Sequence, residues 1–87
     1  MMPLNFAILK LFTDGRTASP EQVVEALQAD YSGHKALNKQ AVLNTLLTAV
    51  SNGLLEEAGF ELDENSELRI YFRSNKEGIA TINSYIK

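Results

Sequence analysis

His34 is the side chain with the clearest capacity for catalysis or metal binding, because it is the only histidine and the chain has no cysteine. The lack of cysteine excludes disulfides, thiolate zinc sites and cysteine nucleophiles. His34 follows Gly33 in a polar connector, and no serine, lysine or carboxylate stands at a spacing that would pair with it. We therefore expect an exposed loop residue, no enzymatic activity and no cofactor.

Two further groups have chemically capable side chains. The run Asp63–Glu67 has the oxygen ligands of a calcium loop but lacks its central glycine and its length, so we expect a solvated turn and no metal. Arg69, Tyr71 and Arg73 alternate along one stretch and form a basic, aromatic stripe suited to nucleic acid. Glutamates predicted to lie across from both arginines are a sufficient structural reason for the stripe.

The composition describes one small domain spanning residues 1–87. The chain is 45% hydrophobic and 22% charged, with a net charge of -3. A folded chain of this mass hides about 63% of its extended surface, so a single core is feasible. The sequence has no basic leader before an apolar stretch and no apolar run near the ~18 residues of a membrane span. We expect a cytoplasmic protein that does not enter a membrane.

Apolar spacing predicts four helices, over residues 4–13, 19–30, 38–52 and 75–86. The second has the most explicit start, since Ser19 is a cap, Pro20 suits the first helical position and Gln22 can bond back to the cap. Asn38 is expected to cap the third helix and Gly53 to end it. Residues 74–77 have the pattern of a capping box with Ser74 as its cap. Residues 16–18 are expected to be an extended connector or a one-bridge strand.

Between residues 55 and 73 the pattern changes to alternation, which predicts a hairpin with one buried and one wet face. The expected pairs on the buried face are Leu62 with Leu68, Phe60 with Ile70, and Ala58 with Phe72. On the wet face the same register pairs Glu61 with Arg69 and Glu57 with Arg73. A slip of the register by one residue would turn Phe60 and Ile70 toward water, and finding them there would contradict the fold built on this hairpin.

The fold class is therefore mainly α with a small β hairpin (α+β). Three helices, a two-stranded hairpin and a C-terminal helix follow the order of a winged helix-turn-helix. The segment Ser19–Gly78 also resembles the small PadR-like and MarR-like transcriptional regulators. Leu37–Val42 is similar to the turn and start of a recognition helix, and Leu46–Leu55 to a leucine pattern ending in Gly-Leu-Leu. Ile70–Gly78 resembles the junction after the wing, with Ser74 and Asn75 where the family usually has Leu and Thr.

The resemblance implies a DNA-binding regulator whose third helix enters the major groove while the wing meets the backbone. Carried over onto this chain, the DNA-binding candidates are Lys35, Lys39, Gln40, Asn44 and Thr48, with His34 at their approach. Amides can pair with adenine, and lysine can meet guanine or phosphate. The solvent-facing side of any helix carries similar residues, and that plain interpretation explains the row equally well.

Two features favour the alternative, a winged-helix protein-interaction module that does not bind DNA. Residues 56–67 carry six of the 11 acids and no basic residue, so this wing repels phosphates. Apolar helical residues also exceed what one core face hides, so either the third helix is buried more widely than usual or Leu43 and Leu47 meet a partner. The candidates for contacting a protein partner or a second copy are Leu43, Leu47, Ile79, Ile82, Tyr85 and Ile86. A positive third helix would favour DNA, and an apolar patch centred on Leu43 and Leu47 would favour a protein.

Overall fold

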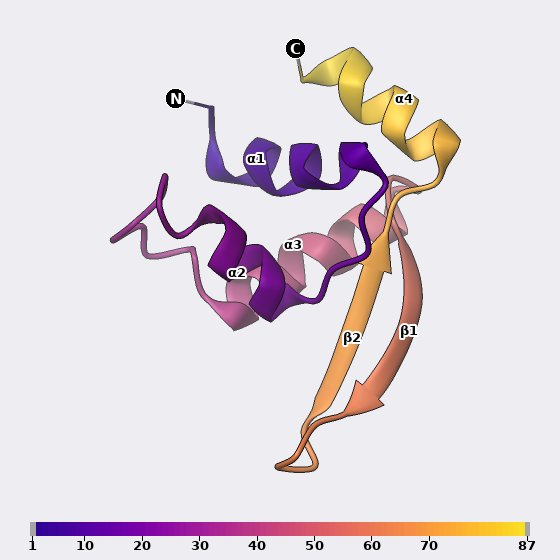
Figure 1. The fold of residues 1–87 in the computed structure, drawn as a ribbon. Coiled ribbons are helices and arrows are strands. Elements are labelled where there is room, and N and C mark those ends of the chain that lie inside the picture. The colour runs from indigo at the N-terminus through magenta and orange to yellow at the C-terminus, as the bar shows by residue number, and fades with distance from the viewer. Residues whose placement is uncertain (1, 87) are drawn as a thin grey trace.

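A computed structural model describes residues 2–86, which form an α+β fold of four α-helices and one antiparallel hairpin. The elements are α1 (Leu4–Leu11), a 3-10 turn η1 (Phe12–Asp14), α2 (Pro20–Leu27), α3 (Lys39–Ser51), β1 (Glu56–Leu62), β2 (Leu68–Arg73) and α4 (Lys76–Tyr85). Helices α1 to α3 pack together, α4 lies on α1 and η1, and the hairpin extends away from the helices (Figure 1). No helix within residues 2–86 has the length and apolar character needed to span a membrane.

The predicted helix signals mostly act as expected. Ser19 Oγ accepts the Gln22 N–H at 3.3 Å, and the Gln22 side chain accepts the Ser19 N–H at 2.9 Å. Asn38 caps α3, as predicted. The cap of α4 is Asn75 and not Ser74, because the Asn75 side chain accepts the Gly78 N–H at 2.7 Å. The Ser74 hydroxyl instead donates to the Leu54 carbonyl at 2.7 Å, which ties the start of α4 to the segment after α3.

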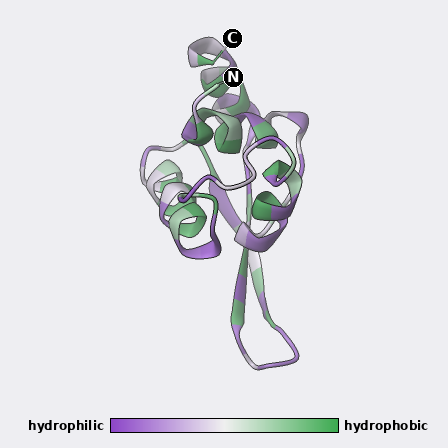
Figure 2. Ribbon diagram, turned by 90° about the vertical axis from the view of Figure 1, so that its left-hand side faces the viewer, coloured by the Kyte–Doolittle hydropathy of each residue, from purple (hydrophilic) through white to green (hydrophobic). Residues whose placement is uncertain are grey.

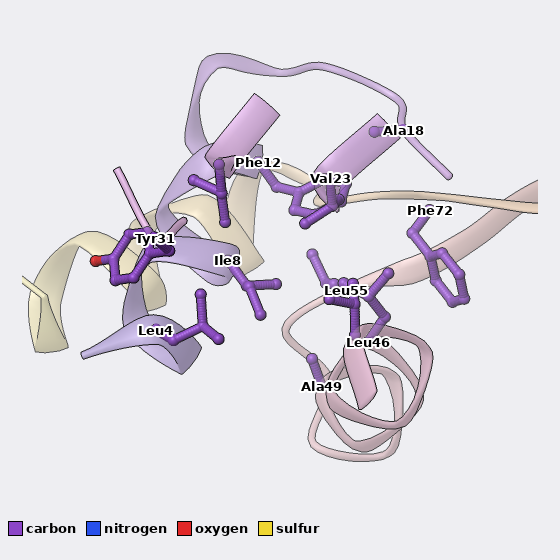
Figure 3. Packing of buried hydrophobic residues seen from close by; sticks show 12 residues of the cluster. Leu4, Ile8, Phe12, Ala18, Val23, Tyr31, Leu46, Ala49, Leu55 and Phe72 are labelled. Atoms are coloured by element: carbon purple, nitrogen blue, oxygen red, sulfur yellow. The ribbon is translucent and has the colours of Figure 1, made fainter. Parts of the chain in front are cut away.

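The core lies where α1, α2 and α3 meet the root of the hairpin (Figure 3). Ile8, Val23 and Leu46 are fully buried there, one from each helix. Phe72 of β2 is also fully buried, and its N–H and C=O bond to Ala18 at 2.8 and 2.9 Å. The connector therefore forms the single predicted bridge. This bridge attaches the root of the hairpin to the helices.

The hairpin register is confirmed in its outer half and wrong near the helices. Leu62 pairs with Leu68 and Glu61 with Arg69, as does Phe60 with Ile70. A bulge between Glu57 and Gly59 then shifts the strands by one residue. Strict alternation cannot reveal an inserted residue, and Gly59 has a φ of 143°, which an L side chain rarely adopts.

The bulge changes the partners at the root of the hairpin. Phe72 pairs with Glu57 and not with Ala58, and Arg73 pairs with Glu56 and not with Glu57. Arg73 Nε lies 3.5 Å from a Glu56 carboxylate oxygen. The predicted charge pair is therefore present with the neighbouring glutamate.

The predicted burial of the apolar hairpin face is wrong in the outer half. Phe60 is 76% exposed, Leu62 67% and Leu68 52%. Ile70 is half-buried, and only Phe72 is fully covered. The physical reason is that the hairpin reaches beyond the helices, so nothing in the described chain covers its tip (Figure 2). On the charged side of the hairpin, Arg69 Nε donates to Glu21 of α2 at 3.3 Å.

Candidate functional site

The predicted recognition row lies together on the outer side of α3 and the loop before it. All of its side chains are exposed: Lys35, Lys39, Gln40, Asn44 and Thr48. Gln40 Nε2 donates to Asn44 Oδ1 at 3.3 Å, and the Thr48 hydroxyl donates to the Asn44 carbonyl at 2.9 Å. His34 is an exposed loop residue whose Nδ1 accepts the Ala36 N–H at 3.2 Å. The row is thus accessible, with amide and hydroxyl groups along one helix face.

Lys39 belongs to a charge network that joins α2, α3 and the hairpin. We use this name for three carboxylates and two cations: Glu21, Glu61, Glu67, Lys39 and Arg69. Lys39 Nζ lies 3.6 Å from Glu21 and 3.7 Å from Glu67, and Arg69 lies 3.3 Å from Glu21 and 3.8 Å from Glu61. The carboxylates outnumber the cations, so the positive charges of Lys39 and Arg69 are offset by neighbouring negative charges.

Glu21 holds the centre of this network. Partial burial raises its pKa, but a backbone hydrogen bond, the charge of Lys39 and the contacts with Arg69 outweigh burial and hold the pKa below its ordinary value. The Tyr71 hydroxyl donates to Glu61, which raises the pKa of Tyr71. Sequence patterns did not identify Glu21 as a partner of the hairpin, because the two are 48 residues apart.

The outer hairpin carries an exposed apolar surface, which we call the hairpin face: Phe60, Leu62, Leu68 and Ile70. Among the described residues six large apolar side chains are exposed, and three of these are on this face. A shallow open depression of about 400 Å³ lies over Phe60, Leu68 and Ile70, with Glu57 and Gly59 at its margin. A contiguous exposed apolar patch on a small domain is typical of a contact surface.

The partner-binding candidates predicted on α3, Leu43 and Leu47, lie outside the hairpin face. Leu43 is half-buried against the core, and Leu47 is only 38% exposed. An apolar patch centred on these two leucines would favour a protein partner, and of the two only Leu47 is exposed. The alternating apolar residues of the hairpin were visible in the sequence, but alternation does not show whether a helix covers them.

The candidates on α4 are mostly covered by the chain itself. Ile82 and Ile86 are buried, Ile79 is half-buried and Tyr85 is exposed. Lys10 of α1 donates to the Asn83 side chain at 2.6 Å and to the Ile86 carbonyl at 3.1 Å, which holds α4 on α1. Ile82 and Ile86 are consequently inaccessible to a partner while α4 keeps this position.

The charge of the molecule is unevenly distributed. Residues 56–73 contain six carboxylates and two arginines, a net charge of -4, while the rest of the chain has a net charge of +1. The ion pairs of the described residues involve neither Glu57 nor Glu64. Among residues 2–86 no group of three potential ligands is placed to hold a metal ion. The hairpin therefore combines an apolar face with a strongly acidic margin.

Comparison with known proteins adds no family to this description. No family model matches the sequence, and no curated protein matches it. The class defined by the structure is an α+β domain with four helices and a protruding two-stranded hairpin.

Proposed function

We propose that this protein is a winged-helix domain that acts as a protein-interaction module, with the hairpin face as its contact surface. The observation that carries the proposal is the exposure of Phe60, Leu62 and Leu68 beside an acidic margin. Covering an exposed apolar side chain with a partner lowers the free energy by roughly 25 cal/mol per Å² of apolar surface removed from water. If this hairpin contacted DNA, it would need lysine or arginine where residues 56–67 carry six acids and no basic residue.

The winged-helix assignment is supported by the order of the elements and by their attachment. Three helices precede the hairpin and a fourth follows it. The bridge between Ala18 and Phe72 adds a short third strand segment beside β2, and α3 presents its outer side next to the hairpin through the Lys39–Glu67 contact. This arrangement is the one that a wing beside a recognition helix requires.

DNA binding by α3 is the second candidate, and the accessible row of Gln40, Asn44 and Thr48 favours it. The charge network opposes it, because Lys39 already lies near two carboxylates. Lys35 is the one other cation of the row. With so few available cations we expect a log-log salt slope no steeper than about -2 per monomer.

The experiment compares two surfaces with matched variants. Phe60→Ser/Leu62→Ser removes the hairpin face, Lys39→Glu removes the cation of the recognition row, and Phe6→Ser removes an exposed apolar residue of α1 as the control. Each purified variant is used to capture proteins from an extract of the source cells, and is titrated with mixed-sequence duplex DNA at two salt concentrations.

We expect the hairpin variant to lose captured proteins that the wild type, Lys39→Glu and Phe6→Ser all retain. We also expect no measurable DNA affinity for any of them at physiological salt. If the wild type binds DNA tightly and in a salt-dependent way, and only Lys39→Glu removes this binding, then the protein is a DNA-binding regulator and the interaction module is wrong.

A further inference from the structure

We infer that β1 is a docking edge, to which an extended basic and apolar segment of a partner protein adds as a third strand. This inference rests on the proposed function and specifies the partner. The unpaired outer edge of β1, the exposed side chains on it and the charge around it carry the inference together.

The two edges of the hairpin have different surroundings. The edge of β2 faces the helices, since Phe72 bonds to Ala18 and Arg69 contacts Glu21 of α2. β1 is the outer strand, and in the described chain its only strand neighbour is β2 (Figure 1). An unpaired strand edge offers a row of N–H and C=O groups to another chain.

The alternation of hydrogen-bonded and non-hydrogen-bonded pairs along the hairpin identifies which residues of β1 have outward N–H and C=O groups. The Asp63 N–H donates to the Glu67 carbonyl at 3.0 Å, so these two residues form a hydrogen-bonded pair beside the turn. Antiparallel pairs alternate, which makes Leu62 with Leu68, and Phe60 with Ile70, non-hydrogen-bonded pairs. The backbone groups of Phe60 and Leu62 therefore point outward from β1. The two residues with free backbone groups are also the two most exposed apolar residues of the strand.

Charge selects the occupant of this edge. The hairpin has a net charge of -4, and Glu57 and Glu64 stand on either side of Phe60 and Leu62. A second copy of the chain would bring an equally acidic hairpin against this one, and DNA would bring phosphates, so both are opposed by like charge. A strand that alternates lysine or arginine with valine, isoleucine or leucine fits, because its apolar side chains cover the hairpin face while its cations lie on the opposite face, where β1 carries Glu61.

The test uses a defined probe, an acetylated and amidated hexapeptide that alternates lysine and valine. Its controls are the peptide with glutamate in place of lysine and the peptide with every amide methylated, which removes all of its strand-pairing donors. Binding is followed by NMR with the full chain, together with amide hydrogen exchange. We expect only the unmodified lysine peptide to bind, and to slow exchange at Phe60 and Leu62 by about tenfold or more.

Two proline variants form a matched pair. Leu62→Pro and Leu68→Pro each remove an apolar side chain from the hairpin face and one outward N–H, the first from the edge of β1 and the second from the edge of β2. We expect Leu62→Pro to weaken the peptide by about tenfold or more and Leu68→Pro by about threefold or less. Should a proline disturb the hairpin, exchange at the Phe60 and Leu62 amides carries the test of the edge, and Phe60→Thr, which keeps strand propensity, tests the apolar contact alone.

The outcomes separate this inference from the proposed function. Binding without slowed exchange at Phe60 and Leu62, and with equal losses in the two proline variants, would overturn strand addition while leaving the hairpin face as the contact surface. Failure of the lysine peptide to bind up to about 1 mM would overturn the basic partner. If sedimentation shows a dimer that Phe60→Asp abolishes, the edge of β1 binds a second copy of the chain, and the inference of a basic partner strand is overturned as well.

Discussion

Two phenylalanines on one hairpin provide the sharpest test of how the fold is stabilised. Alternation assigns Phe60 and Phe72 to the same buried face, but Phe60 is 76% exposed and Phe72 is fully buried at the root. We consider Phe60→Thr and Phe72→Thr, because threonine keeps the strand propensity of the hairpin. The two substitutions remove the same atoms from the same secondary structure, so their difference reports burial.

The expected losses follow from the two exposures. Full burial of a Phe side chain stabilises by about 1.5–3 kcal/mol, and Phe60 buries only about a quarter of its surface, so Phe60→Thr should cost about 0.4–0.8 kcal/mol. Phe72→Thr leaves a cavity in the core at the Ala18 bridge, and truncations of this kind cost about 3–5 kcal/mol. A domain of this size has a free energy of unfolding of about 4–13 kcal/mol, so the second variant is close to unfolding.

Urea unfolding followed by circular dichroism measures both free energies of unfolding. If Phe72→Thr proves unfolded, Phe72→Leu is the substitute, with an expected cost of about 1.5 kcal/mol or less. Equal losses for Phe60 and Phe72 would show that the whole apolar side of the hairpin is packed, which would refute the exposed hairpin face.

Three further outcomes follow from individual contacts. Ser19→Ala removes the reciprocal cap of α2 and should lower the free energy of unfolding by about 1 kcal/mol in the same urea assay. Gly78→Ala should lower it by about 1–3 kcal/mol in spite of the better helix propensity of alanine, because the added Cβ would overlap the Leu54 carbonyl and the Ser74 hydroxyl; a stabilised variant would contradict this packing. Glu21 has a lowered pKa in the folded state, so its contribution is present above the unfolded value of about 4.3 and is lost as the pH falls through the folded pKa. Glu21→Gln should therefore lose stability at neutral pH and unfold with a weaker acid dependence than the wild type, whereas Glu25→Gln, exposed on the same helix, should follow the wild type.

Local signals predicted most of the secondary structure. The caps at Ser19 and Asn38 act over three residues, so the sequence alone contains both partners of each hydrogen bond. The outer hairpin register was predictable for the same reason, since the turn and the alternation lie within one segment. Ser74 was misassigned because its hydroxyl bonds to Leu54, a partner 20 residues away that no local pattern reveals.

The candidate site was less predictable, because it depends on distances between elements. Alternation shows which residues share a face of the hairpin, but not whether a helix covers that face. Phe60 and Phe72 belong to the same alternating apolar pattern, but Phe60 lies far from the helices and is exposed, whereas Phe72 lies at the root of the hairpin and is buried. Likewise, Lys39 has the residue type of a DNA contact, and its neutralisation by Glu21 and Glu67 arises only when α2, α3 and the hairpin are brought together.

The most direct test of the proposed contact surface is a pair of NMR titrations of the labelled full chain, one with the lysine–valine peptide and one with duplex DNA. At physiological salt we expect the peptide to shift backbone resonances between residues 57 and 70, centred on Phe60 and Leu62, and DNA to shift none. Shifts produced by DNA along Lys39, Gln40 and Asn44, with an unperturbed hairpin in the peptide titration, would contradict the interaction module and make α3 the functional surface.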